Sequence, residues 1–212
     1  SLSVIMPTRR GLREALVKAT HKSNANALKK ILRNAPKHHI KQEQDVIKES
    51  TYLAAQNGNV ACLTVLLKHN ANPSQAVTDD GATPAFIAAL NGHAECLKLL
   101  LEHGADPNQA KTDTGASPAF IAAQQGHADC LKLLLLHNVD LNQTTTAKFK
   151  QTPAFIAAKI GHVEIVKVLL AHQTSDPAQS INDNCQGLAN IAKDHGHAEV
   201  EAMLRQAWKE SR

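Results

Sequence analysis

The segment DGATPAFIAALNGHAECLKLLLEHGADPN, Asp80–Asn108, carries a pattern that recurs along this chain of 212 residues. Its heptapeptide TPAFIAA at Thr83–Ala89 returns as SPAFIAA at Ser117–Ala123 and as TPAFIAA at Thr152–Ala158, spaced by 34 and then 35 residues. Glycines extend the same spacing to five positions: Gly58, Gly92, Gly126, Gly161 and Gly196. A fixed period of this length indicates a repeat protein.

Each repeat is predicted to form two short helices. Thr83 and Thr152 are suited to cap the first helix, and the Pro after each occupies its first position, where a missing N–H costs nothing. This helix should run for about eight residues and stop at the glycine. The second helix, about Ala94–His103, has apolar residues at i, i+3 and i+4 and should end at Gly104, a suitable left-handed C-cap. The segment DPNQAKTDTGA that follows is typical of a turn.

This unit, with Thr-Pro at the start of the first helix and Gly-His between the helices, resembles the ankyrin repeat. The resemblance covers roughly residues 44–200 and about six units, with degenerate units at both ends. It implies an all-α solenoid of stacked helix-turn-helix units with turn or hairpin connections. The family's Thr-Pro-Leu-His is here Thr-Pro-Ala-Phe. Lys150 replaces the turn glycine seen at Gly81 and Gly115, in a connection, 138–150, that is one residue longer.

Four segments are expected along the chain. Residues 1–9 are predicted to be a linker or remnant, residues 10–43 a basic capping helical pair, residues 44–183 the ankyrin repeats, and residues 184–212 a C-terminal capping repeat. Terminal repeats need a polar outer face, which fits the loss of the heptapeptide in the last unit. Apolar residues make up 43% of the chain but aromatic residues only 3%, so Ala and Leu should fill the core between closely packed helices.

Charge is distributed unevenly. Residues 1–43 contain ten basic and two acidic side chains, a balance of +8, whereas the remainder has 13 basic and 17 acidic side chains, a balance of −4. The basic end is either a solvated capping face or a contact for an acidic partner, which would be protein, nucleic acid or anionic lipid. Aromatic side chains, which would favour single-stranded nucleic acid, are absent between the cations. The cations singled out for an acidic partner are Arg9, Arg10, Arg13, Lys29, Lys30 and Arg33.

The cysteines and histidines invite a metal or disulfide interpretation, which their spacing does not favour. Cys62, Cys96 and Cys130 lie at the repeat period, so neighbouring copies should be about 10 Å apart, beyond the reach of a disulfide. We expect buried, reduced thiols and therefore an intracellular location, in the cytoplasm, the nucleus or, for a bacterial effector, the host cytosol. Cys185, placed in a turn, is the one thiol worth testing for reactivity. The twelve His show no paired zinc-ligand spacing.

No catalytic or cofactor motif is found in these residues. A nucleophile elbow, a phosphate-binding loop and a dinucleotide glycine fingerprint are all missing. The Asp side chains lie mostly in turns, where they bond their own backbone. We therefore expect no catalytic residues, no metal site and no cofactor within this segment, although a catalytic domain elsewhere in a longer chain stays open.

The resemblance implies a binding surface on the turn tips and the inner, first-helix face, where partners of this family usually lie. At the ends of the first helices, residues vary while their neighbours repeat. Leu90 and Ile160 are apolar at positions expected to be exposed, and Phe149 lies between two Lys in the lengthened loop, so these three are candidate anchors. Free drift of exposed residues would produce the same variation. The full set of candidates is Asn57, Asp79, Asp80, Leu90, Asn91, Asp113, Thr114, Gln124, Gln125, Lys148, Phe149, Lys150, Lys159 and Ile160.

The three heptapeptide phenylalanines are interpreted mainly as packing. Phe86, Phe120 and Phe155 share a repeat position with Tyr52, and an Ala three residues later leaves room for each ring. Exchange of Leu-His for Ala-Phe nearly conserves volume, which cores tolerate. A binding ladder is the second interpretation of the same residues.

We predict a protein–protein interaction module that binds its partner through the concave first-helix face and the turn tips. Two alternatives remain open at this point. The segment could recruit targets for a larger enzyme or a secreted effector, or its basic end could bind nucleic acid or acidic lipid.

Overall fold

The computed structural model describes residues 9–35, 43–146, 150–172 and 184–210. Within these ranges the chain forms twelve helices and no strand. The helices are α1 (Arg9–His21), α2 (Ala25–Asn34), α4 (Gln44–Gln56), α5 (Val60–Lys68), α6 (Pro84–Leu90), α7 (Ala94–Glu102), α8 (Pro118–Gln125), α9 (Ala128–Leu136), α10 (Pro153–Ile160), α11 (Val163–Ala171), α12 (Cys185–Asp194) and α13 (Ala198–Glu210).

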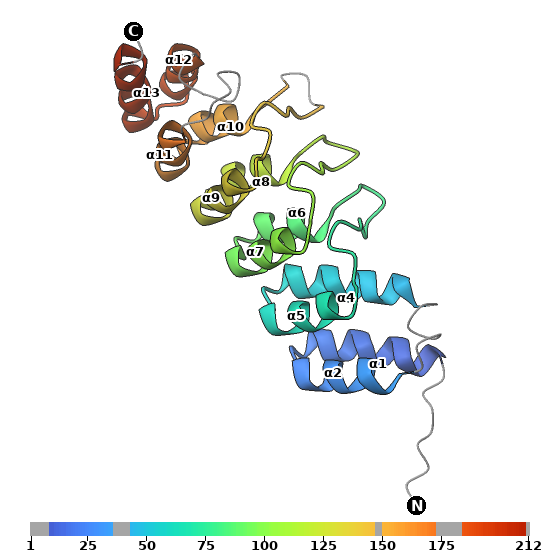
Figure 1. Cartoon of the computed structure of the whole chain (residues 1–212). Coiled ribbons are helices and arrows are strands. Elements are labelled where there is room, and N and C mark those ends of the chain that lie inside the picture. The colour runs from blue at the N-terminus through green and yellow to red at the C-terminus, as the bar shows by residue number, and fades with distance from the viewer. Residues whose placement is uncertain (1–8, 36–42, 147–149, 173–183, 211–212) are drawn as a thin grey trace, which may run out of the picture.

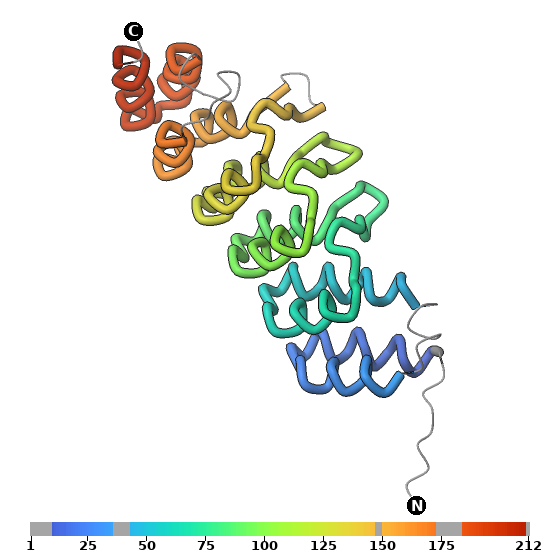
Figure 2. Tube along the Cα trace, in the orientation of Figure 1, coloured from blue at the N-terminus to red at the C-terminus, as the bar shows by residue number. Residues whose placement is uncertain are grey.

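The helices form six antiparallel pairs stacked in two layers (Figure 1). The first helices of the pairs contact one another in the order α1, α4, α6, α8, α10, α12, and the second helices in the order α2, α5, α7, α9, α11, α13. The tube view shows the resulting elongated stack, with α1 and α13 at its opposite ends (Figure 2). The predicted all-α solenoid of about six units is confirmed.

The helix starts confirm the capping prediction. The Oγ atoms of Thr83, Ser117 and Thr152 accept hydrogen bonds from the backbone N–H three residues later, at 3.1, 3.2 and 3.2 Å. A Pro follows each cap at the first helical turn. Each cap satisfies one of the N–H groups that a helix start leaves without a partner. Gly126 and Gly161, at the ends of α8 and α10, are left-handed.

The core is built mainly from small and branched aliphatic side chains, as the composition indicated. Leu63, Leu97 and Leu131, one from each of three successive second helices, are completely buried. Ala residues on the first helices, such as Ala88 and Ala122, are equally buried and allow adjacent helices to approach closely. Leu and Ala therefore form one continuous core along the stack.

Histidines join consecutive repeats. The Nε2 atoms of four histidines lie 3.0–3.1 Å from a backbone carbonyl oxygen at the end of the first helix of the previous repeat. These histidines are His93, His127, His162 and His197. Each ring also lies close to the glycine that follows the first helix of the previous repeat. A Cβ at Gly92 would lie 2.7 Å from the His127 ring, and Gly92 has a φ of +71°. Glycine is required here both by the left-handed backbone and by the close approach of the ring.

The connections after α5, α7 and α9 form three turn tips that project to the same side of the stack (Figure 1). Backbone bonds close the tips between Val77 and Ala82, Lys111 and Ala116, and Thr145 and Gln151, so the third tip is one residue longer, as expected. Backbone bonds of 2.8 Å also join neighbouring tips, from Thr112 N to Asp80 O and from Thr146 N to Thr114 O. The tips therefore form a continuous row.

Candidate partner-binding face

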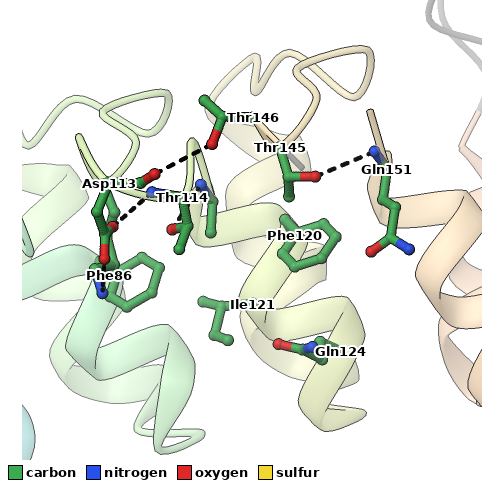
Figure 3. Close-up of a pocket in the computed structure, with 11 residues that line it drawn as sticks. Phe86, Asp113, Thr114, Phe120, Ile121, Gln124, Thr145, Thr146 and Gln151 are labelled. Atoms are coloured by element: carbon green, nitrogen blue, oxygen red, sulfur yellow. Dashed lines mark hydrogen bonds and ion pairs between the residues drawn. The ribbon is translucent and has the colours of Figure 1, made fainter. Parts of the chain in front are cut away.

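We use the term inner face for the surface bounded by the first-helix layer and the turn tips. A pocket of about 460 Å³ lies on it, between α6, α8 and two adjacent tips. The helices contribute Phe86, Phe120, Ile121 and Gln124 to its lining. The tips contribute Lys111, Asp113, Thr114, Ala116, Thr145, Thr146 and Gln151. Figure 3 shows the tip residues on one side of this space and the helix residues on the other.

The floor of the pocket is apolar and its rim is polar. Phe86 and Phe120 are only 6% and 5% exposed, so both rings are packing residues that present an edge to the pocket. The packing interpretation of these two rings is confirmed, and Phe155 also packs against the core while half-buried. Around the rim, Thr145 Oγ1 accepts a hydrogen bond from Gln151 N within the third tip. Thr146 Oγ1 donates one to Asp113 O and so joins the third tip to the second.

One cation is held inside this rim. Lys111 Nζ lies 2.6 Å from an Asp80 carboxylate oxygen, 3.4 Å from one of Asp113 and 5.8 Å from the centre of the Phe86 ring. Its hydrogen bond lowers the pKa of Asp80 to about 2, helped by a hydrogen bond from the Thr78 hydroxyl. The same contact raises the pKa of Lys111. The ammonium is thus fixed over the ring by two carboxylates from neighbouring tips.

Several predicted binding residues meet at this pocket. Asp113, Thr114 and Gln124 line it together, although Gln124 is separated from the other two by the start of α8. Asp80 contributes indirectly, because it orients Lys111. Asp79, on the same tip, is exposed and lies outside the pocket lining.

The predicted residues at the ends of the first helices differ in exposure. Asn57, Asn91 and Gln125 are exposed, and Asn91 Nδ2 donates to Gln56 O. Leu90 was expected to be exposed, but it is half-buried and packs against the core, because the next repeat covers the end of α6. Ile160 is 39% exposed, as expected for a surface position.

The remaining candidates lie around the third tip and α10. Lys148 and Phe149 fall outside the described residues. Lys150 is exposed with a φ of +41°, so it adopts the left-handed conformation of the glycines that it replaces. Lys159 is half-buried, and its carbonyl oxygen is the acceptor for His197.

The basic N-terminal cations are divided between two helices. Arg10 and Arg13 lie on α1, where they pair with Glu14 at 3.0 Å and with Glu49 at 3.7 Å. They line a second pocket, of about 730 Å³, on α1 and the adjoining part of α4. The other predicted cations, Lys29, Lys30 and Arg33, are exposed on α2, in the second-helix layer and away from this pocket, and the side chain of Arg9 lies outside the described residues.

The four thiols are buried, and none of them forms a disulfide. Burial raises the pKa of Cys96 and of Cys130 to about 11, and it raises the pKa of Cys62 as well. Cys185 was expected in a turn, but it is the first residue of α12 and completely buried. Burial of the thiol side chains is what their repeat spacing predicted. Within the described ranges, no three His, Cys, Asp or Glu side chains are grouped so as to hold a metal ion.

Sequence reasoning missed Lys111 and the three Thr and Gln residues of the third tip, Thr145, Thr146 and Gln151. Repeat alignment offered a signal, because Val77, Lys111 and Thr145 close successive tips and only the middle one is charged. The sequence does not show that neighbouring tips place their side chains against one pocket.

A family model that describes ankyrin repeats in three copies matches residues 15–111, 51–145 and 119–207. The chain therefore belongs to the ankyrin-repeat family. Ankyrin repeats are generally protein–protein interaction modules, which bind protein partners and are generally non-catalytic. No curated protein matches the chain. Among the described helices, none has both the length and the apolar character needed to cross a membrane.

Proposed function

We propose that this chain binds a partner protein through its inner face, with the pocket between α6, α8 and the tips as the centre of contact. The observation that carries the proposal is the pocket itself, an apolar floor of Phe86, Phe120 and Ile121 inside a polar rim. Apolar cores with polar rims are typical of protein interfaces. The space is large enough to accept one or two side chains of a partner.

The rim supports a specific orientation of that partner. Thr114 and Gln124 lie on opposite sides of the pocket and provide both donors and acceptors. Lys111 is held by Asp80 and Asp113 and is therefore ordered before a partner arrives. An ordered rim loses less conformational entropy on binding than a mobile one.

Two further parts of the proposal concern the setting of the protein. We place it in a reducing intracellular compartment, which four buried thiols that form no disulfide support. We also propose that the described residues act by binding alone and carry out no reaction.

The test compares two Gln→Arg variants. Partners captured on the immobilised protein would be identified by mass spectrometry, and each would be titrated against wild type, Gln124→Arg and Gln206→Arg. Gln124 lines the pocket, so an arginine there should fill it and weaken binding by about tenfold or more. Gln206 is exposed on α13 in the second-helix layer, so the same change there should leave affinity unaltered.

Circular dichroism must show that both variants keep their helical content. The proposal fails if every captured partner binds Gln124→Arg as tightly as wild type.

A further inference from the structure

The first repeat places a cation, Lys18, at a position of the inner face that is apolar in later repeats. Ser23 has a left-handed φ of +54° and stands 35 residues before Gly58, which sets the register of α1. In that register Val17 occupies the position of Tyr52 and Phe86, and Lys18 that of Leu53 and Ile87.

These side chains line the pocket on α1 and α4, here called the basic groove: Arg10, Arg13, Val17, Lys18, His21 and Lys22, with Glu14 and Glu49 at its edge. Because Val17 corresponds to Phe86, this groove is the N-terminal continuation of the inner face.

The cations of the basic groove are not all neutralised. Arg10 and Arg13 each pair with a carboxylate, Glu14 and Glu49 respectively. No ion pair involves Lys18 or Lys22 within the part of the chain that the structure describes. Lys18 and Lys22 are both exposed, and they line the groove together with the half-buried Val17. The four Lys and Arg side chains of the groove outnumber its two Glu side chains, so the groove carries a net positive charge that attracts carboxylates.

We propose that the basic groove binds an acidic, amphipathic peptide segment of the partner protein. An apolar side chain of the segment would lie on Val17, and its carboxylates would pair with Lys18 and Lys22. The mode is that of an amphipathic segment in a groove, read through one apolar anchor and flanking charges. The proposal rests on the proposed function, since it assigns charge chemistry to a second part of the same face.

A peptide fits this groove better than a nucleic acid or an anionic lipid surface. Val17 offers an apolar contact that an apolar side chain of a peptide would cover and a phosphate backbone would leave unused. No aromatic side chain lines it to stack on a base. Only two of its lysines are unpaired, whereas phosphate binding gains affinity from many simultaneous cation contacts.

The probe is a fluorescently labelled acidic peptide of about twelve residues, built from repeats of Glu-Glu-Leu-Ala. Binding would be measured by fluorescence anisotropy to wild type, to Lys18→Glu/Lys22→Glu, and to Lys29→Glu/Lys30→Glu. The last variant carries the same change of charge on exposed lysines of α2, outside the groove. A milder variant, Lys18→Gln/Lys22→Gln, serves if the charge reversal perturbs folding.

The proposal predicts that the groove variant binds the peptide about tenfold or more weakly, with the α2 variant within about twofold of wild type. Equal losses in both variants would mean diffuse attraction and would overturn it, as would a failure of wild type to bind the peptide. Tighter binding of an oligothymidine strand or of phosphatidylserine vesicles than of the peptide would overturn it in favour of those ligands.

Failure of this proposal is distinguishable from failure of the proposed function. The peptide titration depends on the groove formed by α1 and α4, whereas the comparison of Gln124→Arg with Gln206→Arg depends on repeats further along the stack.

Discussion

Replacement of Gly92 by Ala should destabilise the protein for two separable reasons. Gly92 has a φ of +71°, and a left-handed residue with a Cβ costs about 1–2 kcal/mol relative to glycine. The new Cβ would also lie 2.7 Å from the His127 ring. Because that ring must move, the contact from its Nε2 to Leu90 O, now 3.1 Å, would be lost. Loss of such a hydrogen bond costs about 1 kcal/mol.

Gly104→Ala provides the matched control. Gly104 has a φ of +86°, but a Cβ there would meet nothing within 4 Å. It should therefore show only the backbone cost, about 1–2 kcal/mol, whereas Gly92→Ala should reach about 2–3 kcal/mol. In the double variant Gly92→Ala/His127→Ala the clash is removed. The double variant should therefore lose about 1 kcal/mol less unfolding free energy than the sum of the losses in Gly92→Ala and His127→Ala.

The assay is equilibrium urea unfolding followed by circular dichroism at about 222 nm. Wild type, Gly92→Ala, Gly104→Ala, His127→Ala and the double variant would be measured side by side. Equal destabilisation by Gly92→Ala and Gly104→Ala would refute the close approach of His127 to Gly92. So would strict additivity in the double variant.

Two more predictions concern the tips. Lys150→Gly should raise the free energy of unfolding by about 0.5–1 kcal/mol, because Lys150 is exposed and left-handed with a φ of +41°. A lower urea midpoint than wild type would contradict this. The pKa of Asp80 is lowered to about 2 by Lys111, so the stability that this contact provides should be complete above the ordinary Asp pKa of about 3.9 and be lost as the pH falls toward 2. NMR titration should give a higher Asp80 pKa in Lys111→Met than in wild type, and identical values would show that Lys111 does not act on this carboxyl.

The fold could be predicted from the sequence because its determinants are local and repeated. Thr83 as cap, the Pro after it and the glycine at the helix end act within one repeat, and each appears at the same spacing several times. Agreement between copies also identified Lys150 as a substitute for a left-handed glycine, which its φ confirms.

Contacts between repeats were not predictable in the same way. His127 bonds a carbonyl oxygen 37 residues earlier, and Lys111 joins carboxylates from two tips. Both depend on the rotation of one repeat against the next, which the repeat pattern leaves undetermined. Leu90 was expected to be exposed but is half-buried against the core, and His127 of the following repeat contacts its carbonyl oxygen.

The candidate pocket could be predicted only in part. Repeat variation selected Thr114 and Gln124, but only the stacked structure shows that they share a pocket with Phe86 and Phe120. A single repeat contains no such space, because its walls come from adjacent helices and adjacent tips.

Site-specific photo-crosslinking tests the central claim, that a partner protein lies on the inner face, most directly. A benzophenone side chain would be placed at Thr114, on the pocket rim, and in a separate protein at Lys132, exposed on the second-helix layer. With a partner recovered by capture, irradiation should yield a covalent complex from position 114 and none from position 132. A complex from position 132 alone would place the partner on the opposite layer and contradict the account.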